Sequence, residues 1–373
     1  MRKIMALVMS TVILFTMSMG FEVLASESSS RNNVLSIYSQ QCPAEVMDYA
    51  RNTYERMVNS AVNDGTISSV EEASLGTPFT IEFMETEAPV YYFPVTSQSR
   101  VIATMRVYQD LVLSNAEGRE SYTGILSGFL ADELNELLER NDISSPVCFY
   151  VNGNSIMLYA DGEVETFASL YGEVSPITSS RTPTVTGLEV INPLSKNATM
   201  RIAQSRPTTA VLPLNIIETQ SSIESWCGAY CTSIILRYLR GNTSTPRAHN
   251  LMYYVYGADL EEGDAFGEQD TLNAGVRYGY SPILVRQPIT ATQVFAEIDA
   301  LRPVYIKVRR YDATEGIYKY HAIVIRGYNR TYDTYSVWNP WYNEFETTMN
   351  LNTREYVSRA GIAYTWVSTI YDW

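Results

Sequence analysis

The stretch best suited to covalent chemistry is residues 218–231, which reads Glu-Thr-Gln-Ser-Ser-Ile-Glu-Ser-Trp-Cys-Gly-Ala-Tyr-Cys. It places Trp226 and Cys227 at the opening of an apolar run with helical character, residues 228–239. At a helix N-terminus, unpaired backbone N–H groups and the positive end of the helix dipole favour an anion. These conditions lower a thiol pKa and populate the thiolate, which is the nucleophilic form. Cys227 is therefore the candidate nucleophile, and Cys231, one turn later, is expected to be a small buried residue.

A nucleophilic cysteine needs a base within hydrogen-bond reach and a third group that orients this base. His321 opens the apolar strand-like run 321–325, and Asn339 follows the next strand-like run, in the sequence Trp-Asn-Pro-Trp. A turn around residues 329–330 joins the two runs, so they should pair and bring His321 and Asn339 to one end of a sheet. Asn339 would then accept from one imidazole nitrogen and leave the other to face Cys227. Trp341 would shield this hydrogen bond from water.

Gln220 lies a few residues before the nucleophile, and its side-chain N–H could point at a developing oxyanion. Taken singly, each residue has a plainer interpretation: a histidine on an apolar strand is more often structural, and an asparagine after a strand is more often a turn residue. The combination in this order is much less probable by chance. A metal site is not expected, because His249 and His321 are the only histidines and neither has a ligand cluster in the sequence. No cofactor is expected either.

The Gln…Trp-Cys, His-Ala and Asn-Pro-Trp elements resemble the papain-like cysteine peptidases, and most closely the secreted bacterial staphopain group. The resemblance covers about residues 212–373. It implies that Cys227 is the nucleophile, His321 the base and acid, and Asn339 the orienting residue. It further implies an oxyanion hole of Gln220 and the Cys227 backbone N–H, with protein or peptide substrates. The Gln220–Cys227 interval is one residue longer than the family's usual spacing.

The elements that must position these residues follow an order typical of an α+β domain, in which a helix packs on an antiparallel sheet. After the helix that begins at Trp226, the sequence predicts short helices at 249–256, 269–278 and 290–301. Strands are predicted at 282–285, 304–309, 318–326 and 334–338. Residues 211–373 therefore form the predicted papain-like peptidase domain.

The preceding part of the chain differs in charge. Residues 26–205 carry 10 Lys+Arg and 23 Asp+Glu, whereas residues 206–373 carry 15 and 17, so nearly all of the net charge of −14 lies in the first segment. Such a charge argues against nucleic acid as a partner. The pattern predicts helices at 43–64 and 124–140, strands at 79–83, 90–95 and 101–107, and a hairpin around 152–154. We interpret residues 26–177 as a separate acidic α+β propeptide domain, since such peptidases are made as inactive precursors that their own propeptide inhibits.

Two segments are predicted to be processed. Residues 1–25 have a basic start at Arg2 and Lys3, an apolar core and a small-residue cleavage site ending at Ala25, which indicates a signal peptide and a secreted, extracellular protein. No other run is long and apolar enough to span a bilayer, so no membrane contact is expected after the signal is removed. Residues 178–210 are rich in Ser, Thr, Pro and Asn, and we expect an exposed linker with the maturation site.

The sequence leaves two alternatives to a secreted cysteine endopeptidase. One is another acyl-transfer cysteine enzyme, transglutaminase-like or leader peptidase-like, but these more often place Asp where Asn339 stands. The other is a catalytically silent papain-like binding module. The intact set of Cys227, His321 and Asn339 argues against it.

Overall fold

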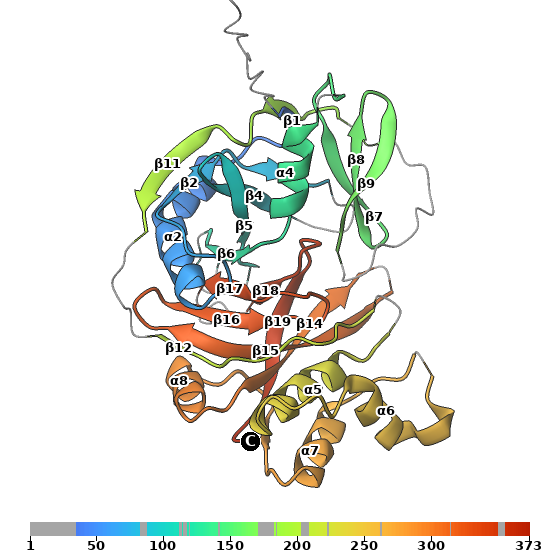
Figure 1. The fold of residues 1–373 in the computed structure, drawn as a ribbon. Coiled ribbons are helices and arrows are strands. Elements are labelled where there is room, and N and C mark those ends of the chain that lie inside the picture. Colours follow the sequence, from blue (N-terminus) through green and yellow to red (C-terminus); the bar gives the residue numbers. More distant parts are fainter. Residues whose placement is uncertain are drawn as a thin grey trace, which may run out of the picture.

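The computed structural model describes residues 35–82, 88–111, 114, 118, 120–140, 142–170, 183, 185–202, 209–221, 224–261, 263–313, 315–349 and 355–373. The predicted signal peptide lies outside these residues. We call residues 35–202 the N-terminal half and residues 209–373 the C-terminal half. Figure 1 shows the N-terminal half, blue to green, on one side of a sheet of orange and red strands, and helices of the C-terminal half on the other side. In the described part of the chain, no helix has the length and apolarity needed to cross a membrane.

The N-terminal half combines a long helix with antiparallel strands. Helix α2 (Ala44–Asn63) begins after Pro43, as its sequence predicts, and buries Val46, Ala50, Tyr54 and Met57 at helical spacing. The predicted hairpin is also present, with Asn152 opposite Ser155 and Gly153 at a φ of 60° that favours glycine. The other elements are β1 (Ile37–Ser39), β2 (Glu72–Gly76), β3 (Phe79–Thr80), β4 (Tyr91–Ser97), β5 (Arg100–Gln109), β6 (Tyr122–Ser127), α4 (Ala131–Glu139), β7 (Cys148–Asn152), β8 (Ser155–Ala160) and β9 (Glu163–Ser169).

The single helix predicted over 124–140 is wrong for its first part. Residues 122–127 form strand β6, and the helix starts only at Ala131, after Leu130 adopts a φ of 64°. The apolar residues Ile125 and Leu126 fit either period. Pairing of β6 with β5 on one side and with a C-terminal strand on the other decides for the strand.

In the C-terminal half, helix α5 (Cys227–Leu239) packs on strand β15 (Ile317–Asn329) and against α6 (Ala248–Tyr256) and α7 (Glu268–Arg277) (Figure 1). Helix α8 (Ala291–Asp299) also packs on β15. The other elements are β13 (Ile283–Val285), β14 (Val304–Asp312), β16 (Thr334–Trp338), β17 (Glu346–Met349), β18 (Glu355–Val357) and β19 (Ala363–Tyr371). The ladders between the named strands are antiparallel, which agrees with the predicted helix-on-sheet arrangement.

The two halves share one sheet. Strand β6 of the N-terminal half pairs with β17 of the C-terminal half through Leu126↔Thr347 and Ile125↔Thr348, so a 14-stranded sheet runs through both. One apolar core cluster also draws buried side chains from both halves. The prediction of a separate propeptide domain is therefore not confirmed.

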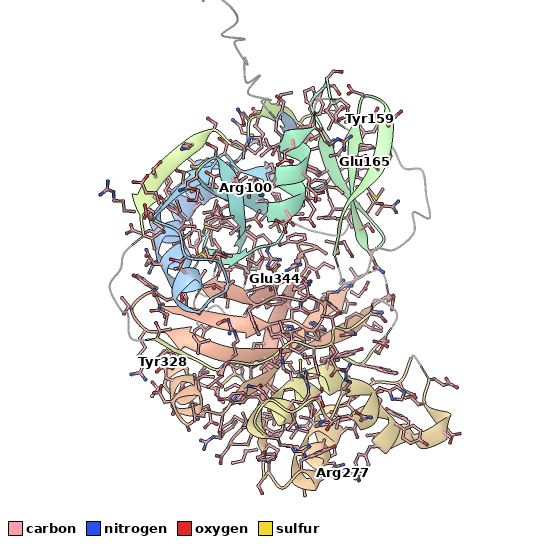
Figure 2. All side chains as sticks on the ribbon, in the orientation of Figure 1. Arg100, Tyr159, Glu165, Arg277, Tyr328 and Glu344 are labelled. Carbon is pink, nitrogen blue, oxygen red and sulfur yellow. The ribbon has the colours of Figure 1, made fainter. Side chains whose placement is uncertain are left out.

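Polar contacts reinforce this junction. The Gly128 N–H donates to Glu344 Oε2 at 3.1 Å, the Tyr92 hydroxyl donates to the Arg359 carbonyl at 2.9 Å, and Glu344 is paired with Arg359. Figure 2 places Glu344 between the two halves. The N-terminal half thus contacts the loops that follow the strands of the candidate site.

The described residues of the predicted linker, 178–210, include three paired strands and are not a free connection throughout. Strand β10 (Glu189–Ile191) pairs with β1, β11 (Lys196–Arg201) pairs with β2, and β12 (Thr209–Val211) pairs with β15. Residues 178–182, 184 and 203–208 lie outside the described residues. The maturation site stays a prediction.

Candidate active site

Helix α5 places Cys227 at its first position, as the sequence predicts. The approach of this helix end to its neighbours requires the glycine that follows. A Cβ at Gly228 would lie 2.2 Å from the carbonyl oxygen of Phe266 and 3.4 Å from the Tyr305 hydroxyl. Because no side chain separates them, the start of α5 lies directly against the segment before α7 and against β14. Cys227 itself is half-buried, whereas Cys231 is fully buried in the helix interior, as predicted.

The Cys227 sulfur has several groups that favour its anion, although burial dominates. Burial raises the pKa of the Cys227 thiol, and the backbone N–H groups of Ala322 and Gly228, together with the positive charge of Lys307, act in the opposite direction. The Ala322 N–H belongs to the residue directly after His321. The nucleophile candidate on α5 is thereby placed beside the segment of β15 that carries the base candidate.

His321 and Asn339 meet as their strands predict. Strands β15 and β16 pair with Val324 opposite Trp338, so Asn339, at the end of β16, lies close to His321. The His321 Nε2 is 2.9 Å from Asn339 Oδ1. The Trp341 ring stacks on the imidazole with a centroid distance of 3.7 Å and an interplanar angle of 17°, so it covers this hydrogen bond.

The imidazole is almost inaccessible in the full chain, with 2% of His321 exposed. Burial lowers the pKa of His321 to about 4, and the hydrogen bond to Asn339 only partly opposes this effect. Together with the raised pKa of Cys227, this favours a neutral thiol and a neutral imidazole over the thiolate–imidazolium pair that nucleophilic attack requires.

Gln220 lies against the same loop as Asn339, since its backbone N–H donates to the Pro340 carbonyl at 2.7 Å. Its side-chain Nε2 donates to the Glu224 carbonyl at 2.5 Å. In this form the amide N–H predicted to meet an oxyanion is therefore engaged within its own loop. The contribution of Gln220 to an oxyanion hole stays a prediction.

Trp226 is buried and its ring lies 6.1 Å from the ring of His249, which is exposed on α6. The second histidine of the chain therefore packs against the neighbour of the nucleophile. Trp226 supports the start of α5, whereas Trp341 supports the imidazole.

Several residues around the site escaped the sequence reasoning. Lys307 lies on β14, opposite Ala322 of β15, and its Nζ is 3.2 Å from Glu268 Oε2. The sequence does offer a signal for Lys307, because a single lysine within the apolar run 304–308 indicates a charge placed there for a specific contact. Tyr356 contacts Asn339 and Glu346 contacts Tyr356, but nothing in the sequence distinguishes this tyrosine from the other 27.

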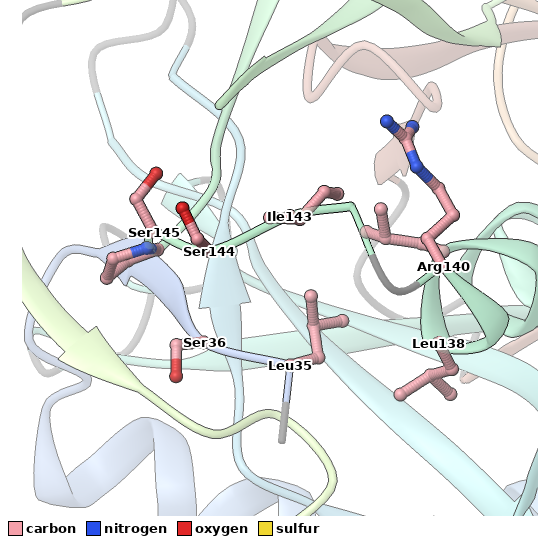
Figure 3. A pocket seen from close by; sticks show the side chains of 9 residues that line it. Leu35, Ser36, Leu138, Arg140, Ile143, Ser144 and Ser145 are labelled. Atoms are coloured by element: carbon pink, nitrogen blue, oxygen red, sulfur yellow. The ribbon is translucent and has the colours of Figure 1, made fainter. Parts of the chain in front are cut away.

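A cavity in the N-terminal half shares no residue with this site. It has a volume of about 160 Å³ and lies between β1 and the segment after α4 (Figure 3). Its lining consists of Leu35, Ser36, Leu137, Leu138, Arg140, Ile143, Ser144, Ser145 and Pro146. The guanidinium of Arg140 is already paired with Asp142 and Glu165, and the lining contains no nucleophile–base pair. We therefore place the chemistry at Cys227 and His321 and not in this cavity.

Comparison with known proteins agrees with this choice of region. Residues 209–366 match the model of the Peptidase_C39 like family. Two curated relatives described as Staphopain A, from Staphylococcus aureus strain MRSA252 and from Staphylococcus aureus, are each 25% identical to the chain over 360 residues. Each alignment covers 92% of this chain and 91% of the relative. The similarity to the relatives therefore extends through most of the N-terminal half as well.

Proposed function

The chain is a papain-like cysteine peptidase that resembles the staphopains, and on this premise we propose that Cys227, His321 and Asn339 form its catalytic triad. The observation that carries the proposal is the 2.9 Å contact between His321 Nε2 and Asn339 Oδ1 under the Trp341 ring. The contact leaves Nδ1 as the imidazole nitrogen available to Cys227, whose sulfur lies near the Ala322 N–H.

The reaction is peptide-bond hydrolysis in two steps. The Cys227 thiolate attacks the scissile carbonyl, and the imidazolium of His321 gives its proton to the leaving amine as the C–N bond breaks. Water, deprotonated by His321, then attacks the thioester, releases the acid and restores the thiol. N–H donors at the start of α5, with Gln220 once its amide is released from Glu224, stabilise the oxyanion of each tetrahedral intermediate.

We further propose that the full chain is an inactive, secreted precursor whose N-terminal half inhibits the site. The support is the direct attachment of the N-terminal half to the part of the chain that follows Asn339, through the pairing of β6 with β17 and the contacts to Glu344 and Arg359. Cleavage within residues 178–210 separates the halves in sequence, and removal of residues 1–25 accompanies export.

The first experiment compares wild type and Cys227→Ala in peptide hydrolysis after activation. The triad requires a loss of at least about 10⁴-fold, on the scale found when a nucleophile is removed from such a unit. Cys231→Ala is the matched control, because Cys231 is the other cysteine of the C-terminal half and lies one turn later on α5. Wild-type hydrolysis by Cys227→Ala would end the proposal.

A second experiment tests the assignment without a peptide substrate. A thiol-directed irreversible inhibitor should label Cys227 of the activated protein in preference to Cys231, the other cysteine of the C-terminal half, whose thiol pKa is raised by complete burial. Equal labelling of both would contradict an activated nucleophile.

The precursor proposal has a test of its own. Purified full-length protein should gain activity when it is cut within residues 178–210, with the two products separated afterwards. Full activity of the uncut chain would contradict inhibition by the N-terminal half, while leaving the triad assignment intact.

A further inference from the structure

Asn339 is held by more than its contact with the imidazole. It is fully buried, and its Oδ1 also accepts the Trp341 backbone N–H at 3.0 Å. On the other side its Nδ2 donates to the Tyr356 hydroxyl at 2.8 Å. The two ends of the amide therefore have different partners, and the amide has one satisfied orientation.

The Tyr356 hydroxyl is committed in turn. It donates to Glu346 Oε2 at 2.8 Å, and both residues are buried. Glu346 lies at the start of β17 and has no exposed side-chain surface. Its other oxygen is paired with the Arg106 guanidinium on β5 and lies 3.7 Å from Arg359 Nε.

The direction of these hydrogen bonds follows from the ion pair. A carboxylate paired with guanidinium groups only accepts, so the Tyr356 O–H must donate to Glu346. The hydroxyl oxygen then accepts from the Asn339 NH₂, which turns Oδ1 toward the imidazole. Because Asn339 Oδ1 can only accept a hydrogen bond, His321 must carry its proton on Nε2, and Nδ1 remains the unprotonated nitrogen.

Building on the triad proposed above, we propose that Tyr356 and Glu346 are positioning residues that fix the amide orientation of Asn339 and thereby the tautomer of His321. In the full chain Arg106 of the N-terminal half completes the same network. Glu346 on β17 and Tyr356 on β18 thereby link the orienting asparagine to a buried cation of the N-terminal half.

The test uses the full chain with Cys227→Ala, which prevents self-cleavage, labelled with ¹⁵N at histidine. The chain has two histidines, so the His321 ring resonances are assigned by comparison with His249→Gln. Long-range ¹H–¹⁵N correlation spectra at neutral pH report which ring nitrogen carries the proton. We expect His321 with the proton on Nε2, and a measurable Nδ1–H population when Tyr356→Phe is added.

Tyr342→Phe is the matched control. Tyr342 is equally buried and its hydroxyl accepts the Arg359 backbone N–H. The Asn339 side chain donates to the hydroxyl of Tyr356 and not to that of Tyr342. It should keep the wild-type tautomer. A folded Tyr356→Phe protein with His321 entirely in the Nε2–H form would overturn the inference, whatever the activity of the enzyme.

An activity measurement on the cut enzyme completes the test. Tyr356→Phe should lower kcat by about three- to tenfold with little change in KM, the size expected for one neutral hydrogen bond. Glu346→Gln keeps the shape of the side chain but makes it a weaker hydrogen-bond acceptor, so its kcat should lie between those of wild type and Tyr356→Phe. A change in KM alone would contradict a positioning role. If the triad proposal itself were wrong, the Cys227→Ala enzyme would still hydrolyse peptides, so the two proposals fail in different experiments.

Discussion

The two halves of the molecule differ in what they contribute to the site. The C-terminal half carries Cys227, His321 and Asn339, and it is nearly neutral. The N-terminal half carries most of the negative charge and has no histidine. Yet one of its few cations, Arg106, is fully buried against Glu346 of the C-terminal half, and its strand β6 extends the C-terminal sheet.

Under the proposed function, this difference separates the reactive groups from the part of the chain that would inhibit them. Reactive groups come from one half, whereas the other half contributes a buried cation and a sheet edge. Inhibition by a half built in this way does not need a residue of its own in the site. The shared sheet and the ion pair both attach the N-terminal half to β17 of the C-terminal half.

The largest expected effect comes from breaking the link between the halves at Arg106. Arg106→Met leaves the Glu346 carboxylate buried with Arg359 as the nearest cation, and removal of one partner of a buried pair costs about 3–5 kcal/mol. Urea unfolding of the full chain with Cys227→Ala measures this loss. The double variant Arg106→Met with Glu346→Met should recover much of it, because apolar replacement of both partners removes the uncompensated charge. A single variant as stable as its parent would show that the halves are not coupled through this pair.

A second effect distinguishes the buried histidine, His321, from the exposed one, His249. The folded pKa of His321 is about 4, below the value of about 6.5 for an unfolded chain. Between these values the unfolded chain binds more protons, so the free energy of unfolding is highest above pH 6.5 and falls as the pH drops toward 4. The His321 contribution to this fall is about 3 kcal/mol.

The measurement is the difference in unfolding free energy between the full chain and its His321→Gln variant, both with Cys227→Ala, from pH 7 to pH 4. Other carboxyl groups titrate in this range, and the difference removes their shared contribution. His249→Gln is the control, because this histidine is exposed. Parallel stability curves for the chain and its His321→Gln variant would mean that the imidazole is not buried in the neutral form.

Sequence reasoning predicted the elements that carry the site better than their surroundings. The helix at Cys227, the strand that contains His321 and the strand before Asn339 have a strong apolar period bounded by turn residues, so their placement followed from local patterns. The pairing of β6 with β17 joins residues more than 200 positions apart, and no local pattern encodes it. The same holds for Tyr356, whose part in the network depends on where β18 folds back.

A smaller effect tests how tightly α5 is seated. Gly228→Ala would place a Cβ 2.2 Å from the Phe266 carbonyl oxygen, so the helix start must shift. We expect a loss of about 1–3 kcal/mol, as for other overpacked sites, and a fall in kcat because Cys227 is the adjacent residue. Gly263→Ala is the control, since a Cβ there meets no atom within 4 Å. Equal stability of the two variants would argue against a tight approach at Gly228.

The smallest effect is expected at the surface of the N-terminal half, where the pair of Arg201 and Glu72 provides the contrast to Arg106 and Glu346. The Arg201 Nε lies 3.3 Å from Glu72 Oε1, but the side chains are 89% and 57% exposed. Water screens both charges whether or not they are paired, so Arg201→Met should change the unfolding free energy by less than about 0.5 kcal/mol. The ratio of this loss to that of Arg106→Met, measured in the same urea experiment, isolates burial as the variable that differs most between the two ion pairs. A loss at Arg201 comparable to that at Arg106 would mean that burial does not set the strength of the two ion pairs.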